Sequence, residues 1–143
     1  MSLAGLPGWA GDLVIAARVA RLALLDADDR PRVLPVTFAI NDGAVYSAID
    51  QKPKRAGEPA RVRWLRRRPE AALCVDRYED DWDRLAWVQL LGRVEVLEIA
   101  ADPSGAAALA AKYPQYRERE PPGPLLRLAV ERVLSWRAAG RRV

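Results

Sequence analysis

The chain has 143 residues, half of them hydrophobic, and it carries a net charge of +4 without a single histidine. A chain of this length can bury one core of good size, so we expect a single domain over residues 1–143. The lack of histidine excludes a Ser-His-Asp or Cys-His catalytic arrangement and any histidine-ligated metal, and the positive charge favours an anionic partner.

Apolar runs and cysteine usage narrow the class further. No uninterrupted apolar run approaches twenty residues, and the first residues lack a basic segment followed by an apolar one. Neither a membrane span nor an export signal is therefore predicted, and the cytoplasm is the expected location. Cys74 is the only cysteine and lies in an apolar run, which favours a core position. A single thiol builds neither an intrachain disulfide nor a thiolate cluster, and no metal site is expected.

The first fifty residues predict one helix followed by three strands. In chain order the segments are 12–21 for the helix and 22–26, 33–40 and 44–49 for the strands. The helix has apolar residues at helical spacing and Asp12 as its predicted N-cap. The sequence Asn41-Asp42-Gly43, between the second and third strands, is a strong hairpin signal. Three strands so close together indicate an antiparallel meander.

The rest of the chain predicts two helices and three strands. In chain order these are a helix over 58–68, strands over 71–78 and 84–98, a helix over 103–113 and a strand over 125–136. Asp102 and Pro103 supply the N-cap and the first residue of the second helix. The proline-rich stretch 116–124 is typical of a connector, and the segment after it alternates like a strand but is also compatible with a helix.

The strand predicted over 84–98 has two different faces. Alternate residues from Ala86 to Val96 form one apolar set, which suits a core. The other set contains Trp87, Gln89 and Arg93, a mixture that suits a face shared by solvent, a ligand and a partner chain. Trp87 is also compatible with a simple packing role, as aromatic residues often have at interfaces.

A basic turn is the most informative stretch of the chain. Lys52, Lys54 and Arg55 follow a predicted strand and precede an arginine-rich helix. Backbone donors at a helix start, together with Lys and Arg side chains, form a pocket for a phosphate group. A solvated loop has a similar composition, so the turn by itself leaves both interpretations open.

These segments together resemble the flavin-binding split-barrel superfamily of pyridoxamine-phosphate-oxidase-like proteins. The resemblance covers nearly the whole chain, and its most specific segments are 18–23, 32–38, 45–55, 76–82 and 87–89. The sequences Lys52-Pro53-Lys54-Arg55 and Asp80-Asp81-Trp82 resemble the actinobacterial branch that uses the deazaflavin coenzyme F420. The implied fold is mainly β, a six-stranded antiparallel split β-barrel with about three short helices.

The resemblance also implies a cofactor site at a homodimer interface. The corresponding positions are Pro35, Val36, Thr37, Ser47, Ala48, Ile49, Lys52, Lys54, Arg55, Arg61 and Trp87. In the family, the backbone of the first three borders the ring, and the next three lead into the phosphate turn. The three cations of the turn match the phosphate clamp. Arg61 is expected to reach the acidic tail of the cofactor, and Trp87 falls where flavin-using relatives often place a Gln from the partner strand.

The implied activity is hydride transfer between coenzyme F420 and a small organic substrate, a reaction that needs no histidine. An FMN-dependent oxidoreductase and a carrier of F420 without chemistry of its own remain alternatives. No catalytic residue is assigned. A basic barrel that binds nucleic acid is a third class, which the gathering of cations in one turn and one helix disfavours.

The basic turn departs from that of the true pyridoxamine-phosphate oxidases. Those enzymes have a Ser-Arg-Lys type of element where this chain has Pro53-Lys54-Arg55, and this chain lacks their C-terminal substrate residues. Oxidation of pyridoxamine phosphate is therefore not expected.

Overall fold

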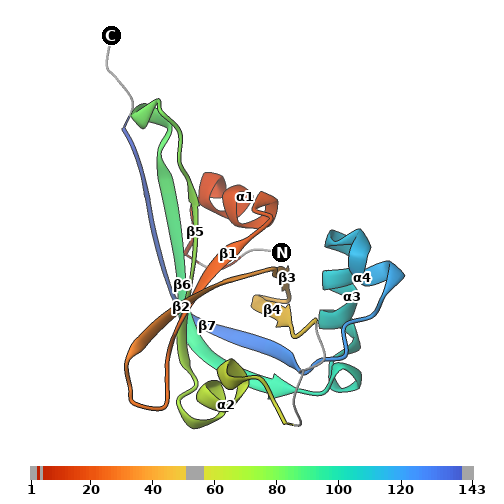
Figure 1. Cartoon of the computed structure of the whole chain (residues 1–143). Helices are drawn as coiled ribbons and strands as arrows, with labels where there is room; N and C mark the ends of the chain where they lie inside the picture. The colour runs from red at the N-terminus through yellow and green to blue at the C-terminus, as the bar shows by residue number, and fades with distance from the viewer. Residues whose placement is uncertain (1–2, 4, 51–56, 140–143) are drawn as a thin grey trace.

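The computed structural model describes residues 3, 5–50 and 57–139, and within them an antiparallel sheet forms the centre of the molecule (Figure 1). The described strands are β1 (Ala20–Leu25), β2 (Pro31–Val36), β3 (Ala39–Asn41), β4 (Ala44–Ala48), β5 (Glu70–Arg77), β6 (Ala86–Leu97) and β7 (Leu125–Arg137). The described helices are α1 (Gly8–Ala16), α2 (Ala60–Arg67), α3 (Pro103–Lys112) and α4 (Pro114–Glu118), with short 3-10 turns η1 (Trp82–Arg84) and η2 (Ile99–Ala101).

The order of the strands explains the shape of the sheet. It is β2-β1-β5-β6-β7-β4-β3, so β2 and β3 are its two edges. These two edge strands are consecutive in the chain and are separated only by Thr37 and Phe38. The sheet therefore has to curl until its edges approach each other, yet it is not closed by hydrogen bonds between them.

The predicted six-stranded barrel is wrong in its strand count, because the segment predicted as one strand over 33–40 is two strands. β2 pairs with β1, whereas β3 pairs with β4. Pro35 lacks an N–H group, and a strand that contains proline is tolerated at a sheet edge, where β2 lies. The prediction of a mainly β, antiparallel fold with flanking helices is confirmed.

The helices differ from the prediction in number and at one boundary. Four α-helices are described rather than three, because α4 lies at the start of the stretch predicted as a connector. α1 covers Gly8–Ala16 instead of 12–21, so Asp12 lies inside the helix and is not its cap. Arg21 belongs to β1, where it pairs with Pro35 of β2. Sheet pairing with a distant strand has overridden the local helical spacing in this segment.

The helices cover the sheet in two groups. α1 contacts β5 and β6, and α2 contacts β1 and β6. α3 contacts β3 and β4, with α4 beside it (Figure 1). The main core contains Phe38, Leu65 and Val88, and a second cluster around Leu109 fills the space between α3 and β4. None of the described helices is long and apolar enough to cross a membrane.

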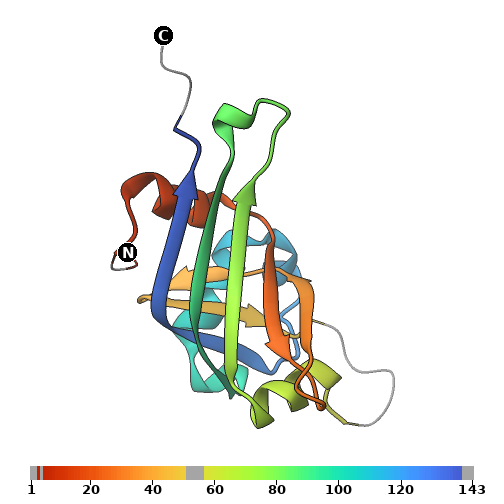
Figure 2. The same ribbon diagram turned by 90° about the vertical axis from the view of Figure 1, so that its left-hand side faces the viewer.

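One face of the sheet is left open. In Figure 2 the strands β1, β5, β6 and β7 turn this face toward the viewer. Cys74 lies on it, half-buried, between Arg21 of β1 and Gln89 of β6. The predicted core position of Cys74 is therefore wrong, because the buried residues of β5 are its neighbours Leu73 and Val75.

Candidate functional site

The cations predicted as the phosphate clamp fall in a gap in the described chain. Lys52, Lys54 and Arg55 lie outside the described residues. The structure does describe Asp50, directly before this turn, and Gly57, directly after it. The clamp therefore stays a prediction, and the site is built from its surroundings.

The structure brings Thr37 and Ser47, two of the predicted ring-side residues, into contact. Thr37 lies in the short link between β2 and β3, and Ser47 lies on β4. The Ser47 hydroxyl donates a hydrogen bond to the Thr37 carbonyl oxygen at 2.7 Å. This bond joins the end of β2 to a strand with which it shares no sheet pairing, and so it positions the backbone of Thr37.

The side chain of Thr37 is held from the opposite direction by Tyr116 of α4. The Thr37 Oγ1 and Tyr116 Oη atoms are 2.7 Å apart, and the Tyr116 hydroxyl donates to the Asp50 carboxylate at 3.2 Å. Because Tyr116 has a single hydroxyl hydrogen and gives it to Asp50, Thr37 is the donor in the first bond. A chain of hydrogen bonds thus runs from the edge of the sheet to the residue that precedes the basic turn.

A second tyrosine fixes the neighbouring residue of the link. The Tyr113 hydroxyl accepts a hydrogen bond from the Phe38 N–H at 3.0 Å. The same hydroxyl has two carbonyl oxygens as acceptors for its single hydrogen, that of Arg18 at 2.9 Å and that of Phe38 at 3.0 Å. The Tyr113 and Tyr116 rings meet edge to face, with centroids 5.6 Å apart. The two tyrosines therefore hold both residues of the link, Thr37 and Phe38, by hydrogen bonds.

The end of β4 is anchored as well. The Ile49 N–H donates to the Pro124 carbonyl oxygen at 3.0 Å, and the Gly123 N–H donates to the Ile49 carbonyl oxygen at 3.1 Å. Both backbone groups of Ile49 are thereby satisfied. The basic turn begins from a fixed point rather than from a frayed strand end.

The predicted site residues differ in what they expose. Pro35 is exposed on β2, and Thr37 and Ser47 are half-buried. The side chains of the other three ring-side residues are buried in the core: Val36, Ala48 and Ile49. Those three are able to contribute only backbone atoms or shape to a ligand site.

Arg61 and Trp87 are not brought to this junction. Arg61 lies in the first turn of α2 and forms no hydrogen bond or ion pair with another described residue. Trp87 lies on the open face of β6, paired with Asp76 of β5 and Trp136 of β7. β6 is three strands away from β2, which corresponds to about 14 Å across the sheet. Within one chain, Trp87 and Thr37 therefore belong to separate regions.

The open face that carries Trp87 is mostly apolar. Its residues include Val33, Ala72, Cys74, Trp87, Gln89, Leu91, Leu134 and Trp136, and Arg21, Asp76 and Arg132 are charged neighbours on the same face. Val33 is 63% exposed and Trp136 is 45% exposed. An exposed sheet face with this many apolar side chains indicates an interaction surface.

Nearby carboxylates neutralise part of the charge of the arginine-rich helix and its C-cap. Arg66 forms an ion pair with Glu58, and Arg67 and Arg68 both pair with Asp29. The Arg66 guanidinium lowers the pKa of the Glu58 carboxyl group, mainly through their hydrogen bond. Less free positive charge is therefore available on α2 than the sequence suggested.

A buried amine lies behind the link. The Nζ atom of Lys112 has no hydrogen-bond partner among the described residues and lies 3.8 Å from the centroid of the Phe38 ring. Burial, helped by the nearby charge of Arg18, lowers the pKa of Lys112 to about 8. Lys112 also lines a cavity of about 420 Å³ together with Ile15 and Ile40. It is the described cation closest to titrating at neutral pH.

The junction itself is suited to orienting a ligand rather than to proton transfer. Burial raises the pKa of Tyr116, so its hydroxyl stays protonated at neutral pH. Thr37 and Ser47 do not ionise under these conditions. The chemistry of a reaction here would have to come from a bound cofactor.

Sequence reasoning missed Tyr116 and Asp50 as members of the junction. Tyr116 lies in the stretch predicted as a connector, and no role is predicted for Asp50, which precedes the basic turn. The spacing of Tyr113 and Tyr116 was the available signal, because residues three apart share one side of a helical turn. The tyrosines contact the link between β2 and β3, and this link was not expected because the sequence predicted one continuous strand over 33–40.

Comparison with known proteins places the chain in a family. A family model described as Pyridoxamine 5'-phosphate oxidase matches residues 10–137. The chain is also similar to solved structures that are 22–24% identical, and this likeness shows the fold alone. No curated protein matches the chain.

Three of these structures come from bacteria. The conserved hypothetical protein Rv2991 from Mycobacterium tuberculosis has a TM-score of 0.71 at 22% identity, over 88% of this chain and 81% of that one. A FAD-binding protein from Mesorhizobium loti has a TM-score of 0.68 at 24% identity, over 91% and 94%. A heme binding protein from Mycobacterium smegmatis has a TM-score of 0.74 at 22% identity, over 95% and 57%. The match of the family model over nearly the whole chain confirms the predicted resemblance, and the protein belongs to the pyridoxamine 5'-phosphate oxidase family of split-barrel proteins.

Proposed function

We propose that the protein is an oxidoreductase that binds coenzyme F420 and transfers hydride between this deazaflavin and a small organic substrate. The observation that carries the proposal is the rigid junction at Thr37, held by Ser47 and Tyr116 and linked through Asp50 to the start of the basic turn. Family membership supports a cofactor-dependent oxidoreductase in general, and the sequence of the turn supports the deazaflavin in particular.

The junction has the properties that a ring-binding wall requires. β2 is an edge strand, so the backbone groups on its outer side are not used by the sheet. Two hydrogen bonds hold Thr37 in place, which lowers the entropic cost of ordering this segment around a ligand. In the proposal, the backbone of Pro35, Val36 and Thr37 borders the ring, and Lys52, Lys54 and Arg55 hold the phosphate.

Arg61 is the α2 cation best placed to meet an acidic cofactor tail. It has no carboxylate partner among the described residues, whereas Arg66 and Arg67 have one each. A free guanidinium binds a carboxylate of the tail without first breaking an internal ion pair.

The second chain of the proposed homodimer would cover the open face of the sheet. This face is apolar, half-exposed and centred on Trp87 and Trp136, which lie side by side across β6 and β7. In this arrangement Trp87 reaches the cofactor of the partner chain, since it is far from Thr37 in its own chain. Neighbouring aromatic side chains of this kind are typical of dimer interfaces.

FMN is the alternative cofactor. Its single phosphate needs fewer cations than the phosphodiester and acidic tail of F420, and two of the four α2 arginines, Arg66 and Arg67, are already paired with carboxylates. An F420 carrier without chemistry of its own is the other alternative, because it would need the same clamp.

Titration of the purified protein with F420 and with FMN tests the proposal, with tryptophan fluorescence as the readout. We expect F420 to bind more tightly, and tighter binding of FMN would overturn the choice of cofactor. Incubation of the protein with reduced F420 and a panel of enones and quinones then separates an enzyme from a carrier. Absence of turnover across the panel would count against an enzyme.

A further inference from the structure

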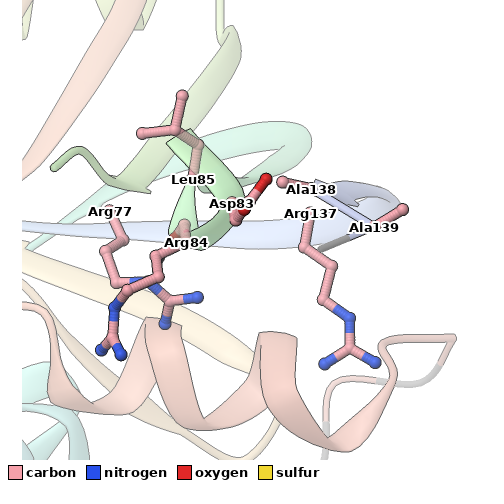
Figure 3. Close-up of a pocket in the computed structure, with 7 residues that line it drawn as sticks. All are labelled: Arg77, Asp83, Arg84, Leu85, Arg137, Ala138 and Ala139. Carbon is pink, nitrogen blue, oxygen red and sulfur yellow. The ribbon is translucent and has the colours of Figure 1, made fainter. Parts of the chain in front are cut away.

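A second pocket lies at the far end of the β5–β6 hairpin. It has a volume of about 510 Å³ and is lined by Arg77, Asp83, Arg84, Leu85, Arg137, Ala138 and Ala139 (Figure 3). β5 begins beside α2 and ends at Arg77, so the pocket and α2 lie at opposite ends of this strand. None of the residues assigned to the cofactor lines it.

The register of three strands creates the pocket. Arg77 of β5 and Arg137 of β7 both pair with Ala86 of β6, one on each side. Paired residues point to the same face of a sheet, and neighbouring strands lie about 4.8 Å apart, so the two Cα atoms are separated by roughly 10 Å. Ala86 itself is buried and does not line the pocket. The strand register therefore places Arg77 and Arg137, which both line the pocket, on either side of β6.

A third arginine completes the arrangement. The Arg77 Nε donates to the Arg84 carbonyl oxygen at 2.6 Å, which ties the strand end to η1. Figure 3 shows the side chains of Arg77, Arg84 and Arg137 all extending toward α1, whereas Asp83 points the other way. On α1, the Trp9 ring lies under the Arg137 guanidinium, 5.2 Å from its central carbon. These two contacts orient the guanidinium groups of Arg77 and Arg137.

The charges in the pocket are only partly neutralised. Arg84 forms an ion pair with Glu79 at 2.7 Å. Neither Arg77 nor Arg137 forms an ion pair with a carboxylate among the residues that the structure describes. Among the described residues, Arg77 and Arg137 therefore bring two positive charges to the hollow without a carboxylate ion-pair partner, and Asp83 is the carboxylate in its lining. A phosphate monoester carries a charge of about −2 at neutral pH.

We propose that this pocket binds the phosphate group of a small organic phosphate. Arg77 and Arg137 contact the phosphate oxygens from two sides, since planar guanidinium groups suit the bidentate binding of phosphate. Ala138 and Ala139 supply apolar surface for the organic part, whereas the Leu85 side chain points away from the guanidinium groups (Figure 3). The volume lies within the range of small-molecule sites, which is about 300–1,000 Å³. The proposal is independent of the cofactor at the β2–β3 junction.

Isothermal titration of the full chain with inorganic phosphate at low ionic strength is the primary experiment. The variant Arg137→Gln removes one guanidinium at an exposed strand end, and Arg77→Lys keeps the charge but loses the planar fork. We expect each variant to bind phosphate about tenfold more weakly or worse, because charge-assisted hydrogen bonds are among the strong ones. Circular dichroism establishes that both variants are folded.

Two further variants separate this pocket from other positive charge. Arg132→Gln makes the same charge change on the same strand, at an exposed position outside the pocket. The combined variant Lys52→Gln, Lys54→Gln and Arg55→Gln removes the predicted clamp. Both should retain binding at the pocket. Equal weakening by Arg132→Gln and Arg137→Gln, or loss of all phosphate binding only in the clamp variant, would overturn the proposal without affecting the proposed function.

Titrations with AMP, adenosine and citrate define the ligand class. Tighter binding of AMP than of inorganic phosphate, without binding of adenosine, indicates an organic phosphate. Equal affinity for AMP and phosphate indicates that the pocket recognises the phosphate group alone. The phosphate site would then stand, but the apolar contact with the organic part would be overturned. Binding of citrate without binding of either phosphate compound would overturn the assignment to phosphate.

Discussion

Thr37 and Tyr116, 79 positions apart in the sequence, form a hydrogen bond between their hydroxyl groups at 2.7 Å. Thr37 lies where the chain passes from one sheet edge to the other, and Tyr116 comes from the short helix α4. The two edge strands are not hydrogen-bonded to each other as they would be in a closed barrel. Instead, a side chain from a helix forms a hydrogen bond with the link between them.

The first prediction concerns this bond. Tyr116→Phe leaves Thr37 and Asp50 without their shared partner, so we expect the free energy of unfolding to fall by about 1 kcal/mol. Cofactor affinity should fall as well, because the backbone of Thr37 is held less firmly. Urea unfolding and cofactor titration measure the two effects. Tyr78→Phe is the control, since Tyr78 is 68% exposed. An unchanged cofactor affinity in Tyr116→Phe would show that the junction at Thr37 does not contribute to cofactor binding.

The second prediction concerns the basic turn. Replacement of Lys52, Lys54 or Arg55 by Gln should weaken cofactor binding by roughly 1 to 3 kcal/mol per contact, because each would lose a charge-assisted hydrogen bond. The thermal unfolding midpoint should stay close to that of the parent protein. Arg30→Gln in the β1–β2 turn makes the same charge change at an exposed position and is the control. Unfolding of the single variants would contradict a ligand-binding role for the turn.

The third prediction separates the two candidate cofactors at α2. Arg61→Gln should weaken binding of F420 several-fold and leave FMN binding unchanged, because FMN has no acidic tail. Arg66→Gln on the same helix is the matched variant, and it should have little effect on either cofactor because Arg66 is already paired with Glu58. Fluorescence titration of both variants with both cofactors makes the comparison. Equal effects of Arg61→Gln on the two cofactors would place Arg61 away from the tail.

The fourth prediction is a pH dependence caused by Lys112. Its pKa is about 8 in the folded protein, against 10.5 for an ordinary lysine, so between these values the unfolded chain holds a proton that the folded chain has lost. Stability should therefore rise with pH across this window, whereas below pH 8 the folded protein bears the full cost of a buried charge.

Lys112→Met removes the titrating group and tests this dependence. The variant should be more stable than the parent protein at pH 7 by about 1 to 2 kcal/mol, after allowance for solvent screening and for the contact with Phe38. This advantage should shrink as the pH rises from 8 to 10. Urea unfolding at several pH values measures it, and a constant difference between the two proteins would show that Lys112 is charged in the fold throughout.

The fifth prediction concerns the packing of α3 on β4. Gly105 is buried, and a methyl group at this position would collide with the Tyr46 ring. Gly105→Ala should therefore lower the free energy of unfolding by about 1 to 2 kcal/mol, since overpacking outweighs the better helix propensity of alanine. Gly11→Ala in α1 is the control, because its methyl group meets no atom within 4 Å. That control should be stabilised by about 0.5 to 1 kcal/mol.

Much of the fold could be predicted from local signals. The hairpin at Asp42-Gly43, the cap of α3 by Asp102 and the strand pattern of β6 all appear as expected. Asp102 accepts a hydrogen bond from the Gly105 N–H at 3.1 Å, as an N-cap does. Such signals depend on residues a few positions apart, and a sequence displays them directly.

The parts that could not be predicted all depend on distant partners. Arg21 belongs to β1 because it pairs with Pro35 and Cys74, although its own neighbours have helical spacing. The strand predicted over 33–40 divides at Thr37, because its first half pairs with β1 and its second half pairs with β4.

The sequence by itself determined the antiparallel β class, the family and the presence of a basic turn after β4. Only the tertiary structure decided that Tyr116 holds Thr37, that Lys112 is buried over Phe38, and that Arg77 and Arg137 face one hollow. The physical reason is the same in all three cases. Each contact joins elements that strand register and helix packing bring together. The spacing of neighbouring residues in the sequence does not determine strand register or helix packing.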